Sequence, residues 1–187
     1  RIGEGSRPGV GTGTVIVLHG FAEDRQAMGN RARIVQAAGW NALTIDSRGY
    51  GESDGRFLTF GALESADVLQ WSRNLAETGR GLGPIVLWGR SMGAAVALMA
   101  AANAAADRTS APGFAGLILE AAYVDLADAV AVWLRLAARC PRRLSLPLAR
   151  AMLARGSRRT NVAPAQPRPL DLAPQRFQPG ARQQHLA

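Results

Sequence analysis

A chain of 187 residues, 48% of them apolar, is long enough to bury the core of one domain. Its formal net charge is +8, and all 22 basic residues are arginine. Residues 134–187 hold 11 arginines and one acid, whereas residues 1–133 hold 11 arginines and 13 acids, so the positive charge belongs to the C-terminal part. Because no recognised nucleic-acid-binding module accompanies these arginines, we expect no nucleic-acid partner.

The single cysteine and the lack of long apolar runs exclude further classes of protein. Cys140 is the single cysteine, which rules out an internal disulfide and a metal site of several cysteines. No apolar run reaches the roughly 18 residues of a transmembrane helix, so we expect no membrane segment in this chain. The start at Arg1 lacks the profile of a signal peptide, although a targeting segment upstream stays open; the cytoplasm is the default expectation. The sequence leaves the oligomeric state undetermined.

Short apolar runs alternate with stretches of helical periodicity along residues 14–122. Strands are expected at residues 14–20, 40–46, 84–89 and 114–122, and the helices between them show apolar stripes such as Met28, Ala32 and Val35. Alternating strands and helices joined by short loops predict a mostly parallel sheet flanked by helices on both faces, an α/β fold.

The pattern changes after the fourth strand. Residues 126–155 read as helix, with interruptions expected near Cys140–Pro141 and at Pro147. Residues 160–187 are rich in Pro and Gln and have no long apolar run, which predicts an irregular tail. We therefore expect three parts: a core at 1–133, a helical cap-like segment at 134–159 and a tail at 160–187.

The stretch "VLWGRSMGAA", residues 86–95, places a serine between two glycines where the third strand passes into a helix. A free serine hydroxyl is a poor nucleophile, so a catalytic serine must be exposed and supplied with a base and with oxyanion donors. Gly-x-Ser-x-Gly in a strand–turn–helix context exposes it, because Gly89 and Gly93 leave room for a sharp turn at Ser91. We interpret Ser91 as a nucleophile.

The stretch "VLHGF" ends the first strand and suggests the oxyanion donors. The backbone N–H of Phe21 is expected to point into the same pocket as the backbone N–H of Met92, the residue after the nucleophile. His19 is a tempting base, but a histidine at a strand end before glycine more often holds the turn. We do not assign His19 a catalytic role.

In order, the segments "VIVLHGF", "IDSRGYGESDG", "TFGALESADVLQW", "GRSMGAA" and "LILEAAYVDLADAV" resemble an α/β-hydrolase. The closest resemblance is to the serine-aminopeptidase-like and BEM46-like branch of serine hydrolases, over residues 14–132. The resemblance implies Ser91 as nucleophile and Phe21 and Met92 as oxyanion donors. It implies for Asp46 a structural role in ordering the Arg-Gly-x-Gly loop. It implies no metal and no organic cofactor.

The triad order of this superfamily is serine, then acid, then histidine. After Ser91 the sequence holds one histidine, His185, and few acids, among them Glu120 and Asp125 just past the fourth strand. One interpretation is a chain cut off before its acid and histidine, with two N-terminal strands also lacking. The other is a compact enzyme in which His185 returns to Ser91, with Asp125 or Glu120 as the acid.

Two charged groups invite other interpretations. Glu64 and Asp67 are expected on a solvated helix face or as partners that hold the glycine-rich loop through Arg48. The arginines between Arg135 and Arg159 are expected on a solvent-facing helix, with a basic cap for anionic or lipid-like acyl substrates as the alternative.

The sequence thus predicts a serine hydrolase that cleaves a carboxylic ester, or an amide, of a small-molecule acyl substrate. The competing hypotheses are a catalytically inactive, hydrolase-like binding module and an incomplete product with an exposed sheet edge. An aspartate nucleophile, as in dehalogenases and epoxide hydrolases, is excluded by Ser91.

Overall fold

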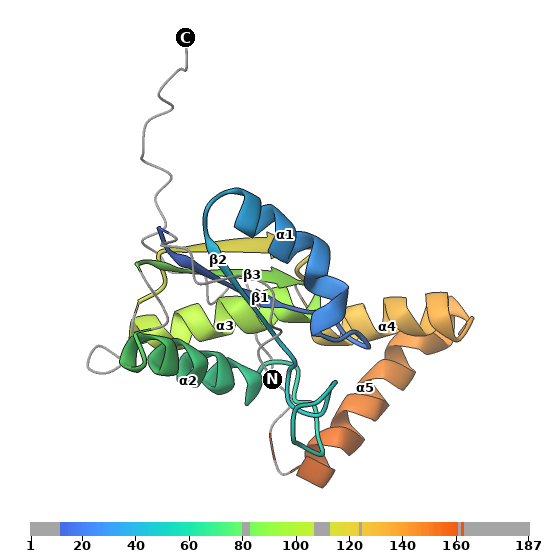
Figure 1. The fold of residues 1–187 in the computed structure, drawn as a ribbon. Coiled ribbons are helices and arrows are strands. Elements are labelled where there is room, and N and C mark those ends of the chain that lie inside the picture. Colours follow the sequence, from blue (N-terminus) through green and yellow to red (C-terminus); the bar gives the residue numbers. More distant parts are fainter. Residues whose placement is uncertain (1–11, 80–82, 107–112, 124, 161, 163–187) are drawn as a thin grey trace.

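A single parallel sheet organises the molecule (Figure 1). The structure, a computed structural model, describes residues 12–79, 83–106, 113–123, 125–160 and 162. The strands lie in the order β2–β1–β3–β4, with bounds β1 (Thr14–Leu18), β2 (Asn41–Ile45), β3 (Ile85–Arg90) and β4 (Gly116–Glu120). All three strand pairs are parallel. The expected α/β fold class and its four strands are confirmed.

Helices cover both faces of this sheet, as the alternation of apolar runs predicts. The short 3₁₀ helix η1 (Arg25–Met28) and α1 (Gly29–Ala37) lie on one face, and α2 (Glu64–Glu77) and α3 (Met92–Ala106) lie on the other (Figure 1). Right-handed crossovers between parallel strands place helices in this way, so β1 is screened from water on both faces, whereas Ile118 and Leu119 of β4 stay exposed.

Alternate side chains of β1 enter two separate cores. Ile16 and Leu18 pack among residues of α2 and α3, whereas Val15 and Val17 pack with Met28 and with residues of α1. Every residue of β1 is buried, which explains the continuous apolar run that follows Thr14 in this strand. Burial of each such side chain contributes roughly 1.5–3 kcal/mol, and it fixes the strand end from which the functional loops leave.

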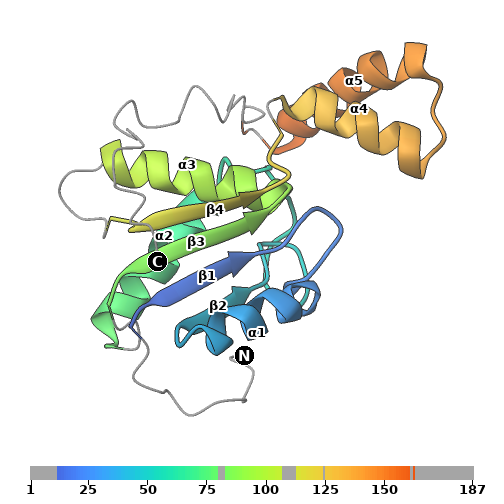
Figure 2. The ribbon, with the colours of Figure 1, turned by 90° about the horizontal axis from the view of Figure 1, so that it is seen from above.

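Two further helices lie beyond the carboxyl ends of the strands (Figure 2). They are α4 (Leu126–Ala137) and α5 (Arg142–Thr160), and the chain breaks between them as expected near Cys140. The interruption predicted at Pro147 is wrong, because Pro147 lies within α5. Packing of Ala149 against Ala131 and Leu134 of α4 stabilises this helix from outside and outweighs the lost hydrogen bond.

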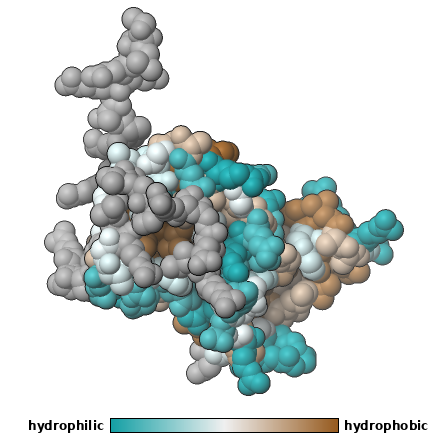
Figure 3. Space-filling model, in the orientation of Figure 1, coloured by the Kyte–Doolittle hydropathy of each residue, from teal (hydrophilic) through white to brown (hydrophobic). Residues whose placement is uncertain are grey.

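The residues expected to form a cap-like segment, 134–159, occupy the end of α4 and most of α5. The division of the chain into three parts stays a prediction, and apart from Thr160 and Val162 the expected tail lies outside the described residues. Figure 3 shows apolar side chains gathered at the surface over α4 and α5. The large exposed ones are Val132, Trp133, Leu136, Leu144, Leu148 and Met152.

The part of the chain that the structure describes lacks two other features. None of its helices is both long and apolar enough to cross a lipid bilayer. Within the same residues, no cluster of three or more His, Cys, Asp or Glu side chains is arranged to hold a metal ion.

Candidate active site

Ser91 occupies a sharp turn between β3 and α3. Its φ is +50°, in the left-handed region that non-glycine residues rarely adopt, and its backbone N–H donates to the carbonyl of Glu120 at 2.7 Å. A Cβ atom at Gly89 would lie 2.5 Å from the backbone nitrogen of Ala94, and one at Gly93 would lie 2.7 Å from the carbonyl oxygen of His19. Only glycine fits at these two positions. The two glycines flanking Ser91 in the sequence are therefore what allows the strained turn to form.

The backbone N–H groups of Phe21 and Met92 make no hydrogen bond with any other described residue. Met92 is the first residue of α3, where helix geometry leaves the N–H without an intrahelical acceptor, and Phe21 follows the end of β1. Gly93 packs against the carbonyls of Leu18 and His19, which brings the N-terminus of α3 to the end of β1. Both N–H groups therefore belong to segments that border Ser91.

Interactions that the sequence did not reveal hold the loop of Phe21 in place. The Glu23 carboxylate accepts the backbone N–H of Gly20 at 3.0 Å and forms an ion pair with Arg90, the residue before Ser91. The hydroxyl of Tyr50 accepts the N–H of Ala22 at 3.3 Å. Glu23 and Arg90 are 67 residues apart in the chain, so no local pattern marks this link.

His19 holds the turn and has no free nitrogen for catalysis. It is fully buried, its Nδ1–H donates to the carbonyl of Gly20 at 2.8 Å, and its Nε2 accepts the N–H of Ser47 at 3.0 Å. The two contacts define a neutral imidazole with the proton on Nδ1. These are the contacts of a residue that holds the turn after β1.

Asp46 orders the loop after β2. Its carboxylate accepts the backbone N–H groups of Arg25 at 2.7 Å and Glu52 at 3.1 Å, and it pairs with the Arg25 guanidinium. Burial by itself raises the pKa of Asp46, but these hydrogen bonds and the positive charge together hold its pKa below the ordinary value. A Cβ at Gly51 would collide with this carboxylate. Asp46 therefore has the contacts of a structural residue.

The two candidate acids have different surroundings. The Glu120 carboxylate accepts Arg31 Nε at 2.9 Å and Trp88 Nε1 at 2.6 Å, and the hydrogen bond from Arg31 is the main reason that its pKa is lowered. Asp125 is exposed and accepts the N–H of Asp128 at 3.1 Å as the N-cap of α4. Neither lines the cavity described below. His185 lies outside the described residues.

Of the two acidic residues Glu64 and Asp67, one lies as the sequence predicts and the other does not. Asp67 pairs with Arg48 at 2.7 and 2.5 Å, which is one of the two predicted roles. Glu64 is 2% exposed and accepts three hydrogen bonds, from the N–H and hydroxyl of Thr59 and the N–H of Gly61. A solvated position for Glu64 is therefore wrong, since the loop before α2 folds over its carboxylate.

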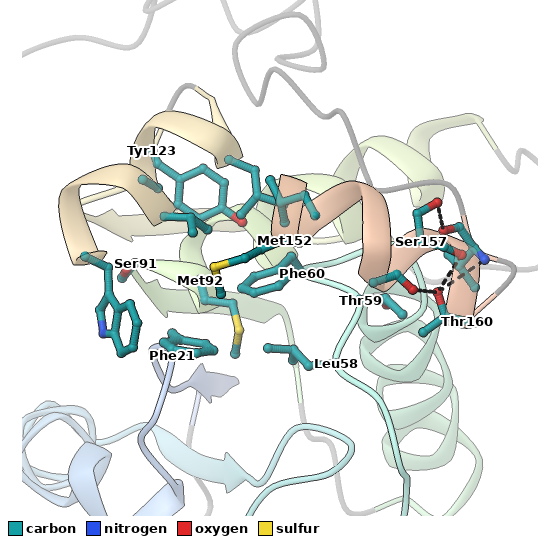
Figure 4. Close-up of a pocket in the computed structure, with 17 residues that line it drawn as sticks. Phe21, Leu58, Thr59, Phe60, Ser91, Met92, Tyr123, Met152, Ser157 and Thr160 are labelled. Carbon is teal, nitrogen blue, oxygen red and sulfur yellow. Dashed lines mark hydrogen bonds between the residues drawn. The ribbon is translucent and has the colours of Figure 1, made fainter. Parts of the chain in front are cut away.

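A cavity of about 260 Å³ opens beside Ser91 (Figure 4). Its walls come from the loop after β1, the loop before α2, the elbow, the start of α4 and the end of α5, and they are mostly apolar. The ring of Phe21 stacks on Phe60 and meets Trp133 edge to face. No arginine of the described residues lines this cavity. All but one of the expected cap arginines between Arg135 and Arg159 are exposed, as their solvent-facing interpretation predicts.

Together, the parallel sheet and the serine elbow at the carboxyl end of β3 define the α/β-hydrolase class of proteins. The chain belongs to the serine aminopeptidase S33 family, whose model matches residues 11–166. The family predicted from the sequence motifs is confirmed.

Similarity to individual proteins is partial in length. Human protein ABHD12B is 35% identical over 95 residues, which cover 49% of this chain and 25% of that protein. The Pyrococcus furiosus esterase Pf2001 is 25% identical with a TM-score of 0.61, over 76% of this chain and 52% of the esterase. An Exiguobacterium antarcticum esterase shares the fold at 18% identity and a TM-score of 0.51, over 75% of this chain and 60% of the esterase.

Proposed function

We propose that this chain is a serine hydrolase that cleaves a carboxylic ester, with an amide as the alternative, through an acyl-enzyme on Ser91. The observation that carries the proposal is the strained Ser91 at the wall of an apolar cavity, bordered by two backbone N–H groups that bond to no other described residue. Membership of the S33 family supports hydrolase chemistry. The similarity to a protein named as an esterase supports ester substrates.

In the first half of the proposed reaction, Ser91 Oγ attacks the ester carbonyl carbon and its proton passes to a base. The carbonyl oxygen becomes an oxyanion that accepts hydrogen bonds from the N–H groups of Phe21 and Met92. Collapse breaks the bond to the alcohol oxygen, which leaves with the proton from the base. Water then attacks the acyl-Ser91 ester in the same way and releases the carboxylic acid. These steps need no metal and no organic cofactor.

The proposed base is His185, with Asp125 as the acid that orients it. The strained turn between Gly89 and Gly93 favours Ser91 as the nucleophile, but His185, the proposed base, lies outside the described residues. A protein with the elbow and without a base retains the cavity and the oxyanion donors, and it is then a hydrolase-like binding module. The two functions differ in one measurable property, which is the nucleophilicity of Ser91.

Labelling of the purified chain by a fluorophosphonate probe tests the proposal, because such probes report a serine activated by a base. Wild type is expected to label, Ser91→Ala to lose the label, and His185→Gln to lower the labelling rate by roughly 10³-fold or more. Ser157→Ala, which removes another hydroxyl of the same cavity, is the matched control and should label as wild type does. A folded wild-type chain without label contradicts hydrolysis and favours the binding module.

A further inference from the structure

Five residues of the Ser91 cavity carry hydroxyl groups, and three of these groups have partners within the protein. The Thr59 hydroxyl donates to Glu64 at 2.7 Å, the Ser157 hydroxyl donates to the Val162 carbonyl at 2.8 Å, and the Thr160 hydroxyl donates to the Gly156 carbonyl at 3.1 Å. The remaining two belong to Ser91, assigned above as nucleophile, and to Tyr123.

The Tyr123 hydroxyl is buried and has no hydrogen-bond partner in the described structure. A buried polar atom without a partner is destabilising, and native proteins keep few of them. Tyr123 follows β4 by three residues, and the elbow is bound to the same segment through Ser91 N–H and Glu120 O. In Figure 4 the Tyr123 ring lies over the cavity near Ser91, with its hydroxyl directed inward on the side of Met152.

The surroundings make this hydroxyl a hydrogen-bond donor toward whatever fills the cavity. Burial, with the nearby negative charge of Glu64 as a smaller cause, raises the pKa of Tyr123, so the group keeps its proton throughout the neutral and mildly alkaline range. The neighbouring walls are apolar side chains such as Leu126, Met152 and Phe60. An apolar ligand leaves the hydroxyl unpaired, whereas a ligand with an oxygen acceptor at that point satisfies it.

We propose that Tyr123 is a specificity-determining residue that selects esters carrying a second acceptor oxygen, an ether, hydroxyl or carbonyl oxygen, within the otherwise apolar group that enters the cavity. The inference rests on the proposed ester hydrolysis at Ser91. The substrate then has two polar points, the scissile ester at Ser91 and the second oxygen at Tyr123, separated by hydrocarbon. Sites with such a buried donor discriminate strongly against analogues that lack the acceptor.

The test measures binding first, so that it does not depend on turnover. The probes are 2-decanone, a ketone analogue of an ester, and its isosteres in which one methylene, from C4 to C9 in turn, is replaced by an ether oxygen. Dissociation constants are measured by calorimetry, and Trp133 in the cavity wall offers a fluorescence signal as a second readout. The proteins are wild type, Tyr123→Phe and Ser157→Ala. Tyr123→Phe removes only an unpaired buried hydroxyl, so it should fold at least as stably as wild type.

For each protein, the affinity of an ether isostere is divided by the affinity of 2-decanone. Comparing this ratio between wild type and a variant cancels the general preference of ethers for water. For at least one oxygen position we expect wild type to exceed Tyr123→Phe by about tenfold, the value of one hydrogen bond. Ser157→Ala should match wild type, because its hydroxyl is already bound to Val162. Equal ratios in wild type and Tyr123→Phe at every position overturn the proposal, and so does a folded protein that binds none of the probes.

Hydrolysis of p-nitrophenyl octanoate and its ether isosteres then separates this inference from the proposed function. Discrimination in binding without hydrolysis contradicts the hydrolase and supports the selectivity of the cavity. If wild type hydrolyses both kinds of substrate, and the ratio of the two rates is the same in Tyr123→Phe, the hydrolase is supported and the role of Tyr123 is overturned.

Discussion

The substitution Gly93→Ala tests whether the elbow depends on backbone contact between α3 and β1. The added Cβ would lie 2.7 Å from the His19 carbonyl oxygen, with the Leu18 carbonyl closer still. Ordinary contacts begin at about 3.4 Å, so the two segments must separate by close to 1 Å. Leu18 is paired with Ile45 and Gly89 on its two sides, and the carbonyl cannot move alone. We expect a loss of about 3 kcal/mol in the free energy of unfolding, the upper part of the range for overpacking.

Urea unfolding followed by tryptophan fluorescence measures this loss, and fluorophosphonate labelling measures its effect on the site. Because Met92 adjoins Gly93, displacement of its N–H should lower the labelling rate by roughly 10²-fold, as loss of one oxyanion donor does. Gly29→Ala is the matched control, since nothing lies within 4 Å of a Cβ there and its φ is −55°. It should stabilise the chain by about 0.5 kcal/mol. Equal stability of the two variants would refute the argument from backbone contact.

Three further outcomes are expected. Ser91→Gly should be about 1 kcal/mol more stable than Ser91→Ala in urea, because only glycine adopts a φ of +50° without strain, and the reverse order contradicts a strained nucleophile. Glu120→Gln should lose about 1 kcal/mol through its bond to Arg31 yet keep its labelling rate, whereas a tenfold slower rate would make Glu120 the acid. The lowered pKa of Asp46 contributes stability that is fully present above its ordinary pKa of about 3.9 and is lost as the pH falls through the lower folded value. Asp46→Asn should therefore show a smaller loss of unfolding free energy than wild type between about pH 4 and pH 2. Identical pH profiles of stability for the two proteins would contradict this.

Local regularities in the sequence predict the sheet and the elbow well. A strand covered on both faces favours a continuous apolar run, and β1 and β3 show one at residues 15–18 and 85–88. The elbow requires glycine two residues before and after Ser91, because the backbone of Gly93 and the carbonyls at the end of β1 leave no space for side chains. In both cases the constraint acts on neighbours in the chain, so a short stretch of residues carries the whole signal.

Predictions fail where distant residues decide the outcome. Glu64 has the composition of a solvated helix position, yet the loop at Thr59 and Gly61 buries it by donating to its carboxylate. Pro147 is a helix breaker in isolation, yet it lies inside α5 because Ala149 packs on α4. Helical and loop preferences amount to about 1–3 kcal/mol, and tertiary packing of a few side chains outweighs them.

By itself, the sequence determined the class of the protein: a parallel α/β sheet with Ser91 presented at a strand end, in the order of motifs that the S33 family shares. The tertiary structure alone decided the surroundings of that serine. It assembled the cavity from five separate segments, occupied both nitrogens of His19, linked Glu23 to Arg90, and left the Tyr123 hydroxyl without a partner among the described residues. The physical reason is range: backbone geometry is set by adjacent residues, whereas burial and hydrogen-bond partners are set by whichever segments the fold brings together.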